Sequence, residues 1–187
     1  AMDPVPARHA LVTGGGRGIG LAVSRRLTKA GFRVTVLGRD EGRLKAAVED
    51  GAAAGHAVAD VTDPQAVQRA VAAATAERGP VGLLVANAGT AETASFARST
   101  PDLFRRMFDL NCLGVVHAAQ AVLPGMVERG DGRIVAVAST AGLKGYPYVS
   151  AYCAAKHAVV GLVKALALET ASTGVTVNAV CPGFADT

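Results

Sequence analysis

The sequence is poor in several residue types that mark particular classes of protein. Aromatic residues make up only 4% of its 187 residues, so Ala, Val, Leu and Gly must supply most of the core. Its three cysteines, Cys112, Cys153 and Cys181, are too few and too far apart for a disulfide framework or a zinc site. They predict free thiols and a cytoplasmic location. The four histidines have no ligand spacing among themselves, so no metal is predicted.

Concentrated charge and long apolar runs are also scarce. The formal net charge is +4, and no Lys/Arg run or aromatic-interleaved basic stripe occurs, so nucleic acid is not an expected partner. We expect no signal peptide before the first strand and no uninterrupted apolar run long enough to span a bilayer, so no membrane is expected either. Residues 1–6 are interpreted as an expression remnant or a disordered tip.

The chain does contain a regular alternation of short apolar runs with longer helical segments. The length predicts one domain, residues 1–187. The runs are apolar on both faces, which is typical of parallel strands covered by helices and predicts a doubly wound α/β fold. The strands are predicted at 9–13, 32–37, 56–59, 81–86, 132–138 and 175–180, and the helices at 18–30, 41–50, 64–78, 102–129 and 150–173.

A glycine-rich segment, TGGGRGIG, joins the first predicted strand to the first predicted helix. Its glycines, Gly14, Gly18 and Gly20 among them, allow close approach of a phosphate, and the helix N-terminus supplies N–H donors. The spacing differs from the G-x-G-x-x-G fingerprint, so a purely structural turn is the alternative. No Lys-Ser/Thr pair follows, which excludes a P-loop nucleotide hydrolase.

Two arginines bear on the type of nucleotide. Arg17 lies inside the glycine-rich loop, and Arg39 follows the second strand. An NAD site places a carboxylate near that strand end, whereas a 2′-phosphate requires cations, so the pattern favours NADP(H) over NAD(H). The alternative is a pair of solvated surface arginines. Asp40 is expected to cap the next helix, and Asp60 either contacts the adenine ring or caps a turn.

The segment from Ser139 to Lys156 is the candidate site of chemistry. Tyr152 and Lys156 are four residues apart, which on a helix places both side chains on one face, and Ser139 ends a strand. Alone, such a pair is usually an ordinary helix contact. Beside a dinucleotide loop, it predicts an acid–base site. Tyr146 and Tyr148 either line the substrate side or pack in the loop.

These motifs together resemble those of the short-chain dehydrogenase/reductase family. They are the loop from Thr13 to Gly20, then Asn87-Ala88-Gly89, Ser139, Tyr152-x-x-x-Lys156 and Pro182-Gly183. The resemblance implies a Rossmann-type sheet of strand order 3-2-1-4-5-6 and a homotetramer or homodimer. It implies the catalytic set Asn111, Ser139, Tyr152 and Lys156. The implied cofactor-binding set is Gly14, Arg17, Gly18, Ile19, Gly20, Arg39, Asp60, Val61, Asn87, Ala88, Gly89, Tyr152, Lys156, Pro182, Gly183 and Thr187.

The resemblance also implies roles for these residues. Tyr152 would exchange the proton, with Lys156 and the oxidised nicotinamide lowering its pKa, while Ser139 holds the carbonyl oxygen. Asn111, inside the fourth helix, would anchor a water. Thr187 would bind the nicotinamide carboxamide, and relatives continue beyond it into a substrate lid and a final strand. Ala86 stands where the family usually has Asn, a change expected to cost little because Asn87 remains.

Within the family, the segments GRIVAVASTAGLKG and GVTVNAVCPGF look most like 3-oxoacyl-thioester and polyketide ketoreductases. The expected substrate is therefore a ketone or secondary alcohol, carrier-bound or a CoA thioester. One alternative is an NAD(H)-dependent secondary-alcohol or hydroxyacyl dehydrogenase. Another is a non-catalytic protein that senses a dinucleotide.

Overall fold

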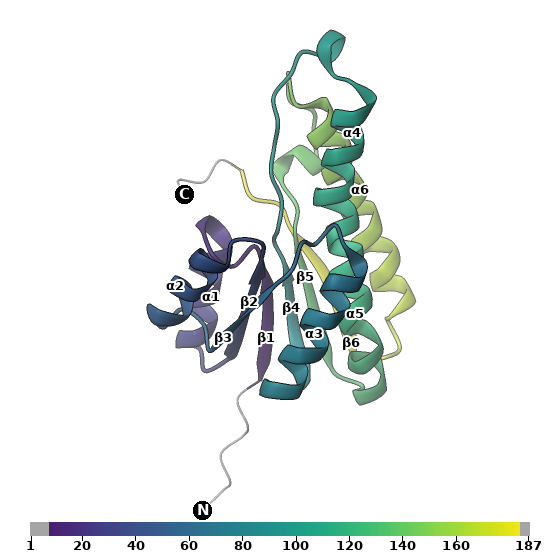
Figure 1. The fold of residues 1–187 in the computed structure, drawn as a ribbon. Helices are drawn as coiled ribbons and strands as arrows, with labels where there is room; N and C mark the ends of the chain where they lie inside the picture. The colour runs from purple at the N-terminus through teal and green to yellow at the C-terminus, as the bar shows by residue number, and fades with distance from the viewer. Residues whose placement is uncertain (1–7, 184–187) are drawn as a thin grey trace, which may run out of the picture.

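The computed structural model of the protein describes residues 8–183. Six parallel strands form one sheet in the order β3-β2-β1-β4-β5-β6, which confirms the predicted order (Figure 1). Each strand begins and ends within one residue of its predicted bounds. The strands are β1 (His9–Thr13), β2 (Arg33–Gly38), β3 (Gly55–Val58), β4 (Val81–Ala86), β5 (Gly132–Val137) and β6 (Val175–Val180).

Helices cover both faces of this sheet. Helices α1 and α2 pack on one face, and α3, α5 and α6 pack on the other (Figure 1). The α-helices are α1 (Gly18–Lys29), α2 (Glu41–Glu49), α3 (Pro64–Arg78), α4 (Pro101–Phe108), α5 (Gly114–Arg129) and α6 (Ser150–Glu169). Short 3₁₀ turns lie at η1 (Phe96–Arg98) and η3 (Thr140–Gly142).

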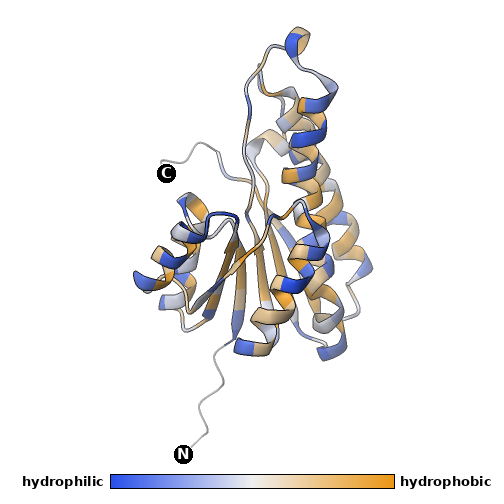
Figure 2. Cartoon of the chain, viewed as in Figure 1, coloured by the Kyte–Doolittle hydropathy of each residue, from blue (hydrophilic) through white to orange (hydrophobic). Residues whose placement is uncertain are grey.

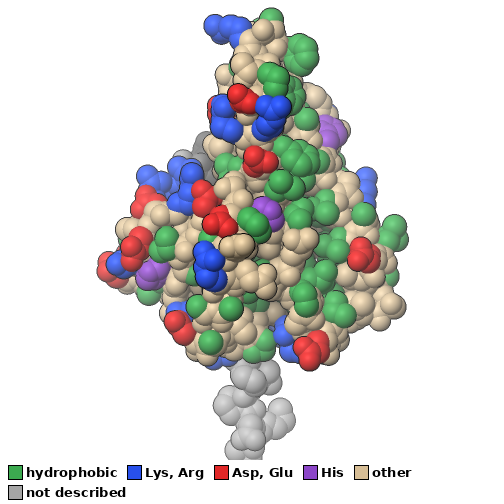
Figure 3. All heavy atoms as spheres, turned by 45° about the vertical axis from the view of Figure 1, so that its right-hand side comes forward, with side chains coloured by type: hydrophobic (Ala, Val, Ile, Leu, Met, Phe, Trp, Pro, Cys, Tyr) green, Lys and Arg blue, Asp and Glu red, His purple; other side chains and the backbone are tan. Residues whose placement is uncertain are grey.

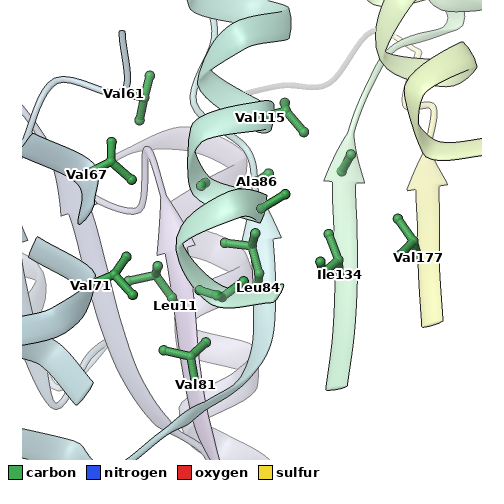
Figure 4. Packing of buried hydrophobic residues seen from close by; sticks show 14 of the residues in the cluster. Leu11, Val61, Val67, Val71, Val81, Leu84, Ala86, Val115, Ile134 and Val177 are labelled. Atoms are coloured by element: carbon green, nitrogen blue, oxygen red, sulfur yellow. The ribbon is translucent and has the colours of Figure 1, made fainter. Parts of the chain in front are cut away.

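The strands contribute alternate residues to two cores. On β1, Leu11 faces the α3–α5–α6 side, whereas Ala10 and Val12 face α1 and α2. Leu11 pairs in register with Leu84 of β4, which pairs with Ile134 of β5, so a row of large side chains crosses the sheet (Figure 4). All three are essentially buried. Each such side chain contributes roughly 1.5–3 kcal/mol by leaving water, so this row helps to fix the strand register.

The helix starts carry the capping residues that the sequence predicts. Asp63 accepts hydrogen bonds from the backbone of Gln65 and Ala66 before α3, and Thr100 accepts one before α4. A proline occupies the first turn of both helices, where its missing N–H costs nothing. Asp40 caps α2 through the backbone N–H of Arg43, as expected.

The helix predicted at 102–129 is not one regular helix. It consists of α4, a π-helical turn η2 (Asp109–Leu113) and α5. The Asn111 side chain donates to the Met107 carbonyl, the group that an α-helical N–H at position 111 would use. This competition for one carbonyl explains the wider turn. The helix predicted at 150–173 ends at Glu169 instead. The Thr170 hydroxyl donates to the Leu166 carbonyl of its last turn, and the Thr173 hydroxyl donates to the carbonyl of Thr170, the residue that follows the helix.

Two helical stretches are long and apolar enough, by length and composition, to cross a membrane. They are Pro101–Arg129 and Ser150–Glu169, and charged residues interrupt both, so neither is the uninterrupted apolar run that the prediction excludes. Figure 2 shows that polar residues are interspersed along these helices and that the strands between the layers are the more uniformly apolar part. Core helices pass the same test, and both stretches contribute to the core cluster on one face of the sheet. The finding is weak evidence for a membrane span.

Candidate active site

A cleft of about 1140 Å³ opens at the carboxyl ends of the strands. In a parallel sheet these ends share one edge, which is where ligands bind in doubly wound folds. The cleft gathers residues from all six strand ends. Sixteen predicted site residues line it: Gly14, Arg17, Gly18, Ile19, Arg39, Asp60, Val61, Asn87, Ala88, Gly89, Asn111, Ser139, Tyr152, Lys156, Pro182 and Gly183.

Two predicted residues are not among those that line the cleft. Gly20 lies under the loop, where an added Cβ would collide with the Gly14 carbonyl and the Asn87 side chain. Its role is therefore to let helix α1 start close beneath the loop. Thr187, predicted to bind the carboxamide, lies outside the described residues.

The glycine-rich loop turns sharply between β1 and α1. Gly14 and Gly18 have φ values of +67° and +52°, which side-chain-bearing residues rarely adopt. A Cβ on Gly14 would also lie only 3.0 Å from the Ala88 Cα atom. The loop backbone and the N-terminus of α1 therefore face the cleft without side chains to block a phosphate.

Asn87 braces this loop against the end of β4. Its side-chain nitrogen donates to the carbonyls of Thr13 at 3.1 Å and Gly14 at 3.3 Å. The Thr13 hydroxyl in turn accepts the backbone N–H groups of Asn87 and Ala88, both at 3.0 Å. These bonds give Asn87 the backbone-stabilising geometry expected of it, with Ala86 beside it buried in the core.

An exposed ion pair lies at one end of the cleft. Arg39 Nη1 is 3.6 Å from Asp60 Oδ2, and both residues line the cleft. The other Asp60 oxygen accepts the backbone N–H and the hydroxyl of Thr62, so turn capping accounts for it. Burial raises the pKa of Asp60, but the Thr62 hydrogen bonds and the Arg39 charge outweigh it and the net pKa is lowered.

Ser139, Tyr152 and Lys156 meet at the other end of the cleft, as predicted from their spacing. Lys156 is buried, its ammonium lies 5.6 Å from the centre of the Tyr152 ring, and it donates to the Val137 carbonyl at 2.9 Å. Ser139 Oγ accepts the Ala141 N–H at 3.1 Å, and its hydroxyl is also hydrogen-bonded to Tyr152.

The electrostatics of this trio differ from the sequence expectation in one respect. Burial raises the pKa of Tyr152 above its ordinary value, and the hydrogen bond with Ser139 only partly offsets this. Burial also lowers the pKa of Lys156 to about 8, so the amine remains mainly protonated at neutral pH. The expected lowering of the Tyr152 pKa is therefore wrong for the protein alone, because desolvation is the largest effect.

Asn111 sits in the π-helical turn and is fully buried. Its side-chain nitrogen donates to the carbonyls of Thr90 and Met107, and its oxygen accepts the Thr90 N–H at 3.2 Å. The neighbouring Gly89 keeps a narrow gap open, since a Cβ there would lie 2.6 Å from Asn111 Oδ1 and 3.6 Å from Lys156 Nζ. Both amide donors of Asn111 are thus committed to the protein backbone.

Two of the cysteines and two of the tyrosines do not line the cleft. Cys112 and Cys153 are free thiols, as predicted, and both are buried; burial raises the pKa of the Cys112 thiol. Tyr146 bonds the Thr140 hydroxyl at 2.9 Å, and Tyr148 is exposed. Within residues 8–183, no three His, Cys, Asp or Glu side chains are grouped so as to hold a metal ion.

Sequence reasoning missed several residues that line the cleft. Gly16, Arg43 and Leu44 border the end near Arg39, and Thr90 borders the end near Asn111. Arg43 and Leu44 carried a usable signal, since they fall in the first turn of the helix that follows Arg39. Gly16 belongs to the glycine-rich loop itself.

Comparison with known proteins agrees with this geometry. Residues 8–187 match the family described as short chain dehydrogenase. A putative ketoacyl reductase of Streptomyces coelicolor is 44% identical over 95% of this chain and 70% of its own length. An acetoacetyl-CoA reductase of Shinella zoogloeoides is 40% identical over 97% of this chain and 75% of its own length.

A solved structure shares the fold of this chain. A variant of the actinorhodin polyketide ketoreductase, crystallised with NADPH, superposes with a TM-score of 0.93 at 42% identity. The match covers 96% of this chain and 71% of that one. With its sheet order, its glycine-rich loop and the cleft that joins Ser139, Tyr152 and Lys156, the chain belongs to the short-chain dehydrogenase family of oxidoreductases.

Proposed function

We propose that this protein is an NADP(H)-dependent carbonyl reductase whose substrate is a 3-oxoacyl thioester or a related ketone. One observation carries the proposal: Ser139, Tyr152 and Lys156 line the same cleft as the glycine-rich loop and Arg39. A proton donor, an oxyanion donor and a dinucleotide cradle therefore share one space. The relatives named as ketoacyl and acetoacetyl-CoA reductases support the choice of substrate.

The residues present fit a nicotinamide dinucleotide. The bare backbone at Gly14 and Gly18 and the start of α1 would hold the pyrophosphate, and Arg39 would hold the 2′-phosphate. Lys156 spends one of its three N–H donors on Val137 and has two left for the ribose hydroxyls. When bound there, NADPH supplies the hydride.

Tyr152 and Ser139 act on the carbonyl oxygen. Tyr152 gives its phenolic proton to that oxygen as negative charge develops on it. Ser139 donates its O–H to the same oxygen, and its own position is fixed by the Ala141 N–H. The Lys156 ammonium, 5.6 Å from the centre of the Tyr152 ring, would stabilise the phenolate that remains.

Turnover with a matched set of ketones tests this proposal. We expect NADPH oxidation, followed by absorbance, with acetoacetyl-CoA and with a cyclic ketone such as a decalone, and a higher kcat/KM for NADPH than for NADH. A higher kcat/KM for NADH would favour the NAD(H)-dependent dehydrogenase. Tight binding of NADPH with no turnover on any ketone would favour the non-catalytic sensor and overturn the enzyme proposal.

We further propose that copies of the chain associate through α5 and α6. Only 28% of the 18-residue apolar stretch within α6 is buried in one chain. Val127 of α5 and Leu168 of α6 are exposed. Figure 3 shows hydrophobic side chains gathered on the side of the molecule that carries these helices. We expect light scattering to give a dimer or tetramer that Leu168→Glu weakens. A monomeric wild-type protein would refute the association.

A further inference from the structure

A third arginine lies at the Arg39 end of the cleft. Arg43 lines it together with Arg17 and Arg39, and it belongs to the first turn of α2. Asp40 holds this residue twice, because one carboxylate oxygen accepts the Arg43 backbone N–H and the other lies 3.1 Å from Arg43 Nε. The contact uses Nε, so the two terminal nitrogens of the guanidinium remain available to a ligand.

The glycine-rich loop lies directly against Arg43. A Cβ on Gly16 would be 3.3 Å from the Cβ of Arg43 and 3.4 Å from Leu44 Cδ2. The absence of a side chain at Gly16 therefore allows α2 to approach the loop closely. A ligand held by the loop backbone and flanked by Arg39 would lie within reach of the Arg43 side chain.

Positively charged side chains outnumber carboxylates at this end of the cleft. Arg17, Arg39 and Arg43 face two carboxylates, Asp40 and Asp60. The Arg39–Asp60 separation of 3.6 Å is too long for a strong hydrogen bond, so this pair can open to admit an anion. Two guanidinium groups on adjacent elements can each donate paired hydrogen bonds to a phosphate.

We propose that Arg43 binds the 2′-phosphate of NADP(H) together with Arg39, and that Asp40 positions it for this contact. Arg43 is then a determinant of cofactor specificity contributed by α2 rather than by the loop or by the end of β2. This inference rests on the NADP(H) preference of the proposed function. It assigns Arg43 no part in the proton transfer at Tyr152.

Binding of two adenosine nucleotides to the whole protein tests the proposal by calorimetry. The probes are 2′,5′-ADP, which carries the 2′-phosphate, and 5′-AMP, which lacks it. We expect Arg43→Gln to weaken 2′,5′-ADP binding by about tenfold, the scale of one charge-assisted hydrogen bond, and to leave 5′-AMP unchanged. Arg43→Lys should recover part of the loss. The ratio of kcat/KM for NADPH over NADH should fall in parallel.

A matched control lies on α4. Arg105 forms an i,i+3 ion pair with Asp102, which lies in the first turn of that helix, and Arg105 does not line the cleft. Arg105→Gln should change neither nucleotide affinity, and thermal unfolding of all variants should match the wild type. Equal weakening of both nucleotides by Arg43→Gln, or no weakening of either, would overturn the assignment of Arg43.

The same binding measurements distinguish a wrong NADP(H) preference from a wrong role for Arg43. If the wild-type protein binds 2′,5′-ADP no better than 5′-AMP, the NADP(H) preference itself is wrong and the role of Arg43 falls with it. If the wild type prefers 2′,5′-ADP and only Arg39 variants lose that preference, the NADP(H) proposal stands and the role of Arg43 alone is refuted.

Discussion

The two ends of the cleft hold their polar side chains in opposite ways. At the end near β2, Arg39 and Arg43 are 72% and 55% exposed and pair with exposed carboxylates. At the end near β5, Lys156 is 4% exposed and Asn111 is fully buried, and both are hydrogen-bonded to backbone carbonyls. The first end is therefore adjustable, whereas the second is fixed by the core.

This difference has an energetic meaning. Exposed ion pairs contribute roughly 0–1 kcal/mol to stability, so the arginines can exchange their partners for a phosphate at little cost. A buried ammonium is costly to desolvate, as the lowered pKa of Lys156 shows. Preorganisation is thus concentrated where we propose that the proton moves. Substitutions at the fixed end should lower kcat. Substitutions at the adjustable end should change the preference between NADPH and NADH.

The largest effect is expected from Tyr152→Phe at the fixed end. It removes the phenolic proton but keeps the ring over Lys156 Nζ. Because a positioned acid typically contributes about 100-fold to 10,000-fold, kcat should fall by a factor in that range in steady-state assays. The NADPH dissociation constant and the melting temperature should stay near wild type. Retained activity would mean that another group supplies the proton.

Arg39→Asp should produce the next largest effect, at the adjustable end. It replaces a cation by a carboxylate that repels the 2′-phosphate and can accept ribose hydroxyls. We expect the ratio of kcat/KM for NADPH over NADH to fall by about 100-fold, the upper range for losing charged hydrogen bonds. Activity with NADH should persist. An unchanged ratio would show that this strand end does not select the cofactor.

Gly89→Ala tests how rigid the fixed end is. The new Cβ would fill the gap between Asn111 Oδ1 and Lys156 Nζ. Overpacking of this kind costs about 1–3 kcal/mol, so we expect a lower melting temperature and a loss of about tenfold in kcat. The matched control is Gly161→Ala on α6, where nothing lies within 4 Å of the added atom. Equal behaviour of the two variants would contradict a preorganised site.

The smallest effect is expected outside the cleft, at His9 at the amino end of strand β1. His9 is buried, with Nδ1 donating to the Gly79 carbonyl at 2.7 Å and Nε2 accepting from the Thr35 hydroxyl at 2.8 Å. Burial lowers its pKa below the ordinary 6.5. The unfolded chain therefore binds more protons as pH falls below about 6.5, and the free energy of unfolding should decrease there.

Urea unfolding of the wild type and of His9→Gln between pH 5 and pH 7.5 measures this dependence. The variant keeps a polar side chain but has no group to titrate, so its stability should vary less with pH over that window. The same pH dependence in both proteins would assign the effect to other groups.

The family resemblance predicted the sheet order, and the sequence itself predicted most of the cleft for a physical reason. Parallel strands bring their carboxyl ends to one edge, so polar residues after β1, β4 and β5 had to meet. Other features depend on packing that no local pattern records. The wider turn at Asn111 arises from a bond to Met107, and the raised pKa of Tyr152 arises from burial. The place of Arg43 depends on the missing side chain at Gly16.

The π-helical turn Asp109–Leu113 carries one residue more than an α-helix needs over the same path. Deleting one residue from it would let α4 and α5 continue as a single regular helix along the same path. The sheet would be untouched, yet Asn111 would turn away from Thr90. One additional residue in this turn is therefore what directs the Asn111 amide to the Thr90 backbone beside the cleft.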